Sequence, residues 1–270
     1  MYSIVYITIH MATKATDIDV NLFQIGHMED STTVSSQKIA WINYETNRGK
    51  LNIQTPVFVT ETCGIPREGV YYPTDRSRAF FKLPFCHERA RHSDEMDYCA
   101  MGKFYNKLVE LDKYFGSEEV KLQLFGDKMA SKYEYQPIVR HPERDDEEED
   151  VNDMSSTRAV KDYYRPPYAK IKLPLNDSET PLFRLLDKKD DGGGTREIPL
   201  NSFTDVTKHM RYMTKHRMII DVQKLYAMKT SSGGDKRKYG VTVRLVAAEC
   251  TNRAEITNNK CVDFFWRLTN

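Results

Sequence analysis

The last third of the chain carries the residue types that can bind a polyanion. Between Lys208 and Arg244 the sequence has ten Lys or Arg residues and two acids, Asp221 and Asp235, with tyrosines interleaved. Lysine and arginine neutralise phosphates, and aromatic faces stack on unpaired bases, so the combination favours single-stranded nucleic acid as a partner. The alternative is an ordinary solvated, charged surface, and the sequence alone weighs the two equally.

The acidic residues are concentrated in one segment. The formal net charge is +1, but residues 143–153 (ERDDEEEDVND) contain eight acids and one arginine, so the rest of the chain is basic. Runs of like charge repel one another and bury no apolar area. We therefore expect a disordered acidic loop at 141–160 that interrupts a single OB-like domain over residues 16–270. The loop is either simply solvated, or it competes with nucleic acid for the basic surface or recruits a basic partner.

Composition and cysteine usage set the broad class. With 40% hydrophobic and 11% aromatic residues the chain can build a core, and no apolar run approaches the roughly 20 residues that span a bilayer. Residues 1–15 are expected to be disordered or a mis-called N-terminal extension. The sequence from Met11 looks like an ordinary translation start, and residues 1–10 lack signal-peptide features. Five cysteines without paired short spacings are typical of a reducing compartment. We predict an intracellular chain, in cytoplasm or nucleus, without a membrane partner.

Catalytic and metal-binding motifs are not evident in the sequence. Four residues of the types that bind zinc lie close together in the sequence: Cys86, His87, His92 and Cys99. No C-x-x-C pair is among them, so we expect buried thiols and surface histidines rather than a zinc site. There is no nucleophile elbow, His-Glu-x-x-His or Walker loop, and no pair of carboxylates outside the acidic run. The sequence therefore predicts no catalytic residues, no metal, no cofactor and no enzyme.

Hydrophobic periodicity predicts mostly strands. They are expected at 38–44, 79–85, 168–175, 217–229 and 239–249, with the last two as a hairpin and residues 38–44 as a hairpin with the segment after Gly49. Phe104, Leu108, Leu111 and Phe115 share one helical face, which predicts a core-packing helix over 100–114 that ends at a left-handed Gly116. The pattern argues for a mainly β fold with helical insertions (α+β), a small antiparallel β-barrel or sandwich rather than a parallel α/β sheet. Among small barrels, the OB type presents a basic and aromatic strand face.

The order of several motifs resembles a known family. These are IAWINY (39–44), GKLNIQTP (49–56), FYNKLVELDKYF (104–115), KLQLFGDK (121–128), YAKIKLPL (168–175), RMIIDVQKLYAMK (217–229) and KYGVTVRLVAAE (238–249). In that order they resemble the single-stranded DNA-binding proteins of large nucleocytoplasmic DNA viruses of eukaryotes, over about residues 38–250. The resemblance implies an OB-type barrel elaborated by helices. It also implies a non-enzymatic role in coating single strands during viral DNA replication or recombination, in the cytoplasm or nucleus of a host cell.

The candidate site joins the family motifs with the basic last third of the chain. Its aromatic members would stack on bases, and its cations would contact phosphates. Trp41 also fits the core, and the lysines also fit an ordinary surface. The predicted nucleic-acid-binding residues are Trp41, Tyr44, Arg48, Lys50, Tyr168, Lys170, Lys172, Arg211, Lys215, Arg217, Lys224 and Arg244.

Several partners and one rival function stay open at this stage. Single-stranded DNA is the expected ligand and RNA is the alternative, because contacts to the 2′-hydroxyl cannot be read from sequence. Viral replication proteins are further expected partners. The aromatic C-terminus (CVDFFWRLTN) stands where many replication-type binders have an acidic tail, and it either packs back on the domain or joins a second copy. The rival is a structural or virion-assembly β-sandwich whose basic surface faces the genome or another subunit.

Overall fold

The protein is described here by a computed structural model. It describes residues 12–45, 50–60, 64–85, 100–142, 166–188, 194–211, 213–231 and 234–251. Arg48, most of the expected acidic loop, the Cys86–Cys99 cluster and the aromatic C-terminus lie outside the described residues. So do residues 1–11 of the expected N-terminal extension, whereas Thr13–Lys14 form strand β1.

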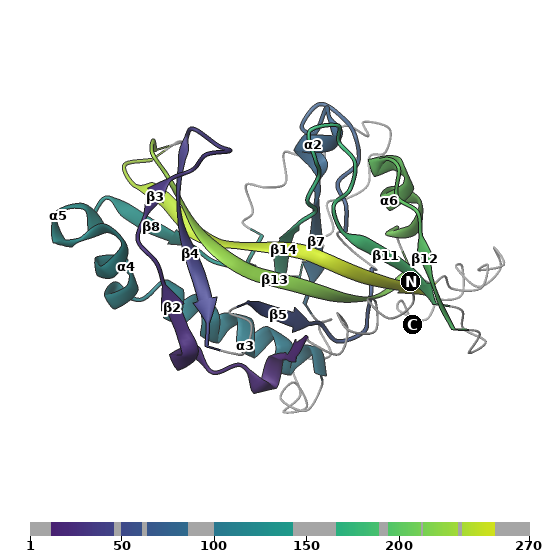
Figure 1. The fold of residues 1–270 in the computed structure, drawn as a ribbon, viewed down its shortest axis with the longest axis horizontal. Helices are drawn as coiled ribbons and strands as arrows, with labels where there is room; N and C mark the ends of the chain where they lie inside the picture. The colour runs from purple at the N-terminus through teal and green to yellow at the C-terminus, as the bar shows by residue number, and fades with distance from the viewer. Residues whose placement is uncertain are drawn as a thin grey trace, which may run out of the picture.

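A long β-hairpin forms the centre of the fold (Figure 1). Strand β13 (Lys215–Met228) pairs antiparallel with β14 (Arg237–Thr251), as the sequence predicted. Apolar residues on one face of this hairpin, such as Ile220, Val222 and Leu245, are almost fully buried. The register shifts between Ile219 and Ile220 and again between Val222 and Lys224. Such bulges bend a strand and change which side chains face the core.

Short strands pair end to end along the outer edge of β13. These are β4 (Gln37–Tyr44), β5 (Leu51–Gln54) and β6 (Phe58–Val59). The predicted hairpin between residues 38–44 and the next segment is therefore wrong, because β4 and β5 each pair with a different stretch of the 14-residue β13. Beyond them, β1 pairs parallel with β5, and β2 (Phe23–Ile25) and β3 (Glu29–Asp30) pair with β4.

The other side of the sheet mixes parallel and antiparallel pairs. Strand β14 is parallel to β8 (Tyr133–Gln136), β10 (Tyr168–Lys172) and β11 (Arg184–Lys188). Strand β10 in turn pairs antiparallel with β7 (Phe80–Pro84) and with β9 (Val139–Arg140). Strand β11 pairs antiparallel with β12 (Thr195–Ile198).

This topology overturns the predicted OB-type barrel. The described residues form a mixed, 14-stranded sheet whose longest path runs β1-β5-β13-β14-β10-β7. A barrel closes when its first and last strands pair, and in this part of the chain β1 and β7 do not pair with each other. Several strands are also parallel to their neighbours, so the sheet is not purely antiparallel. The protein is mainly β, with an open sheet.

Helix α3 (Ala100–Phe115) covers one face of the sheet, as Figure 1 shows. The predicted helix is confirmed: its four periodic apolar residues are buried in the same core as Phe81 and Ile171. Gly116 ends the helix for a different reason than predicted, because it does not have a positive φ. A Cβ there would lie 2.8 Å from Asp112 O and from a ring carbon of Tyr135, so glycine allows a close approach.

The remaining helices are short and peripheral. They are α2 (Asp75–Arg78), α4 (Glu118–Phe125), α5 (Asp127–Ala130) and α6 (Phe203–His209), together with the 3-10 turns η1 (Ala15–Asp17) and η2 (Val20–Leu22). Because α3 covers one face, we call the face of the β4-β13-β14-β10-β7 strands that points away from α3 the open face.

Candidate nucleic-acid interface

Strand β10 places three predicted site residues on the open face. Ala169 and Ile171 are buried against the core, so Tyr168, Lys170 and Lys172 point the other way, as the alternation predicted. The neighbours of these lysines across the sheet are also cationic. Lys170 lies opposite Lys82 of β7, and Lys172 lies opposite Arg244 of β14. Like charges directly opposite each other destabilise a sheet.

A bulge in β13 brings Lys224 to the same face. Val222 lies opposite Val243, but the next paired residue is Lys224, opposite Thr242, so Gln223 is the extra residue. Thr242 and Arg244 alternate with the buried Val243 and therefore share the open face. Without the bulge, strict alternation along β13 would have directed Lys224 to the core.

Trp41 stands at the β4 end of this face. It is the cross-strand partner of Lys224, and its side chain is 44% exposed, whereas Ala40 and Ile42 beside it are buried. The indole Nε1 donates a hydrogen bond to Glu29 Oε1 at 3.0 Å, which fixes the orientation of the ring. Lys224 Nζ lies 5.7 Å from the ring centroid. Trp41 is thus an exposed platform with a cation beside it rather than a core residue.

Three cations on the open face, Lys172, Lys224 and Arg244, are close enough to affect one another. We call the set Trp41, Lys82, Lys170, Lys172, Lys224 and Arg244 the basic cluster. Burial, together with the charges of Lys172 and Arg244, lowers the pKa of Lys224. Arg244 forms an ion pair with the buried Asp221, with 2.8 Å between Nη2 and Oδ2. The cluster has five cations, and this ion pair involves one of them, so positive charge is in excess.

Aromatic rings support two of the lysines. Lys170 Nζ lies 4.0 Å from the centroid of Phe80, and Lys82 Nζ lies 5.1 Å from that of Tyr168. Cation–π contacts of this kind hold the flexible lysine stems near the sheet. Tyr168 is half-buried, so its ring serves partly as a support and partly as exposed surface.

The other predicted residues are dispersed. Tyr44 is buried, its hydroxyl accepts a hydrogen bond from Asp19 N, and its ring packs on Phe23, so it does not present a face for stacking. Lys50 is exposed just before β5. Arg211 is exposed after α6 and lies outside the basic cluster, and Lys215 is exposed at the start of β13.

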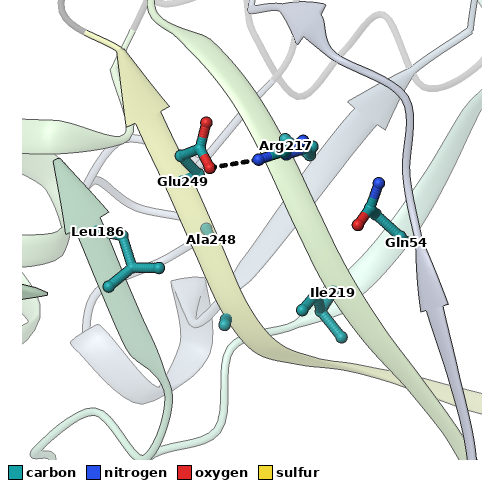
Figure 2. Close-up of a pocket in the computed structure, with 7 residues that line it drawn as sticks. Gln54, Leu186, Arg217, Ile219, Ala248 and Glu249 are labelled. Carbon is teal, nitrogen blue, oxygen red and sulfur yellow. Dashed lines mark hydrogen bonds and ion pairs between the residues drawn. The ribbon is translucent and has the colours of Figure 1, made fainter. Parts of the chain in front are cut away.

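Arg217 belongs to a separate ion-pair group at the far end of β13. Its Nη2 lies 2.6 Å from Glu249 Oε2, and Lys188 Nζ lies 3.5 Å from the other oxygen of that carboxylate. Figure 2 shows the ion pair between Arg217 and Glu249, which line a pocket together with Gln54, Leu186, Ile219, Ala247 and Ala248. Glu249 engages the charge of Arg217, as Asp221 engages that of Arg244.

Sequence reasoning missed one cation of the basic cluster. Lys82 is flanked by the buried Phe81 and Leu83, so alternation within the predicted strand at 79–85 could have placed it on the open face.

Neither a metal-binding group nor a membrane-spanning helix is seen in the described part of the chain. No group of three His, Cys, Asp or Glu residues within it could hold a metal ion. None of its helices is long and apolar enough to cross a membrane.

The fold and the site together define a mainly β protein with an open sheet and a basic, partly aromatic face. No protein-family model matches the chain. The chain is similar to an uncharacterized protein of Acanthamoeba polyphaga mimivirus, with 28% identity over 231 residues. The match covers 78% of this chain and 55% of the relative, so the chain spans about half the length of the protein it matches. Its similarity is thus to a protein of a large nucleocytoplasmic DNA virus.

Proposed function

We propose that this protein binds single-stranded nucleic acid, with little sequence preference, across the basic cluster. The observation that carries the proposal is that cations lie opposite each other on neighbouring strands, Lys82 with Lys170 and Lys172 with Arg244. Like charges in such positions repel each other. A phosphate between the two cations would turn the repulsion into attraction and release counterions.

The shape of the face favours a single strand over a duplex. The cluster crosses the five neighbouring strands β4, β13, β14, β10 and β7, which at about 4.8 Å per strand gives a surface about 19 Å wide. A sheet surface of that width does not enter a major groove, which is about 12 Å wide. The exposed ring of Trp41 offers stacking to an unpaired base, and bases paired in a duplex cannot use it.

The biological role follows from the viral similarity and the family resemblance together. We propose that the protein coats single-stranded DNA during viral DNA replication or recombination, in the cytoplasm or nucleus of an infected cell. Replication proteins of the virus are the expected partners in that role. The basic cluster provides charge and stacking and no catalytic group, so we propose binding rather than catalysis.

Fluorescence anisotropy with a labelled oligothymidine tests the proposal, with a duplex and an RNA of equal length as competitors. We expect tight binding that weakens steeply with salt, and weaker competition by the duplex than by unlabelled oligothymidine. The RNA arm decides between DNA and RNA as the natural ligand. Equal, weak binding of single strands and duplex would contradict the proposal and favour a structural or virion-assembly role.

A further inference from the structure

The loop that precedes α2 lies next to the basic cluster. It starts at Gly64, which exchanges two backbone hydrogen bonds with Lys82: Gly64 N donates to Lys82 O at 3.0 Å, and Lys82 N donates to Gly64 O at 2.9 Å. It continues through a tight turn in which Gly69 and Tyr72 bond to each other through their backbones. After α2 the chain enters β7 at Phe80, so both ends of the loop are fixed to the same edge strand.

Aromatic contacts bring this loop onto the open face. The ring of Tyr72 packs edge-on against the ring of Phe80, with 5.5 Å between centroids. Lys170 Nζ lies 4.0 Å from the centroid of the same ring. Tyr72 of the loop and Lys170 of the basic cluster therefore both contact Phe80. In Figure 1, α2 and the adjoining loop rise beside β7, on the opposite side of the sheet from α3.

The tip of the loop presents large apolar side chains to solvent. Val70 is 83% exposed and Tyr71 is 51% exposed. Arg67 and Arg76, on either side of the tip, are also exposed. The two acids of this segment, Glu68 and Asp75, both pair with Arg78, so Arg67 and Arg76 add further positive charge to it. An exposed aromatic ring in a segment with this excess of cations matches the chemistry of a base and its phosphate, because the ring takes the base and the cations take the charge. This charge complementarity argues for nucleic acid as the occupant of the tip.

We infer that Tyr71 is a second stacking contact, and that a bound strand crosses the sheet transversely from Trp41 at β4 to Tyr71 beyond β7. The inference rests on the function proposed above and adds the direction of the path. The basic cluster alone is about 19 Å wide at 4.8 Å per strand. At about 3.4 Å or more per nucleotide it holds about six nucleotides or fewer. A base at Tyr71 requires a longer oligonucleotide.

A length series of oligothymidines separates the two ends of this path. Affinities are measured by anisotropy for wild type, Tyr71→Ala and Tyr71→Phe, with oligonucleotides from 4 to about 12 nucleotides, a range set by the cluster width. We expect Tyr71→Ala to weaken binding of the longest oligonucleotides by about fivefold or more and to leave the shortest nearly unchanged. Tyr71→Phe keeps the ring and should bind like wild type. Because Tyr71 is exposed, neither variant removes a core residue.

The outcomes distinguish the inference from the function it rests on. If wild type does not bind oligothymidine at any length, the proposed function itself fails. If wild type binds and Tyr71→Ala has no effect, or the same effect at every length, single-strand binding stands and the transverse path is wrong. Crosslinking with an oligonucleotide carrying a photoreactive pyrimidine at one end checks the direction independently. The path predicts adducts near Tyr71 from one end and near Trp41 from the other, and adducts with one residue from both ends would overturn it.

Discussion

The double variant Lys170→Gln with Lys172→Gln removes two charges from the centre of the basic cluster. Both side chains are exposed on β10 and point away from the core. Glutamine keeps much of the side-chain length and a polar end, so the change acts mainly on charge. If both lysines contact phosphates, the variant forms two fewer phosphate contacts than wild type.

The size of the effect follows from counterion release. For single strands the slope of log K against log salt is about −0.7 per phosphate contact, so the loss of two contacts makes the slope shallower by about 1.4. If the two proteins bind equally at 1 M salt, their affinities differ by about 1.4 log units at 0.1 M, or about 25-fold. This corresponds to about 2 kcal/mol of binding free energy.

The assay is an anisotropy titration of oligothymidine at four or more salt concentrations. The control is Lys103→Gln with Lys113→Gln, which removes the same charge from exposed positions on α3, on the other side of the sheet. We expect the control to keep the wild-type slope to within measurement error. Equal changes in slope for the two double variants would refute the reasoning, since they would show a general charge effect. An unchanged slope in the β10 variant would place the strand's open face away from the ligand.

Four further predictions concern single positions. Lys172→Gln, which relieves the repulsion with Arg244, should raise the free energy of unfolding by about 0.2–1 kcal/mol in urea at low salt, and a loss of stability would contradict the like-charge argument. Trp41→Ala should weaken oligothymidine binding by about 1–3 kcal/mol in anisotropy titrations, whereas Trp41→Phe should keep most of the affinity. Burial lowers the pKa of His216 to about 4, so the unfolded chain takes up a proton below about pH 6.5 that the native state does not bind. The free energy of unfolding in urea should thus fall by about 2 kcal/mol more in wild type than in His216→Leu between pH 7.5 and pH 5, and equal losses would refute this assignment. Asp112→Ala leaves two backbone N–H donors without their acceptor and should cost about 2–4 kcal/mol by the same denaturation assay, so a neutral result would show that water replaces the carboxylate.

Sequence patterns correctly predicted the features that depend on a single helix or a single strand. The spacing of apolar residues on α3 needs only the helix itself, and the alternation of Tyr168, Lys170 and Lys172 needs only β10. The same alternation rule also separates two of the predicted stacking residues. Trp41 and Tyr44 lie three residues apart on β4, so they point to opposite faces and could not both be exposed stacking platforms.

Apart from the β13–β14 hairpin, features that depend on strand pairing could not be predicted. A predicted strand does not reveal its partner, and β13 is long enough to pair with β4, β5 and β6 in succession. An open sheet and a closed barrel can therefore arise from similar sets of strands. The position of Lys224 depends on a single extra residue, Gln223, in the ladder with β14. No spacing in the sequence marks that bulge.

The fluorescence of Trp41 gives the most direct test of the central claim that single-stranded nucleic acid binds at the open face. The chain has two tryptophans, Trp41 and Trp266, so a Trp266→Phe protein reports from Trp41 alone. We predict that oligothymidine changes this emission and that the change saturates at the concentration where anisotropy saturates. Oligothymidine that binds by anisotropy without changing the emission of Trp41 would contradict the claim and place the ligand elsewhere.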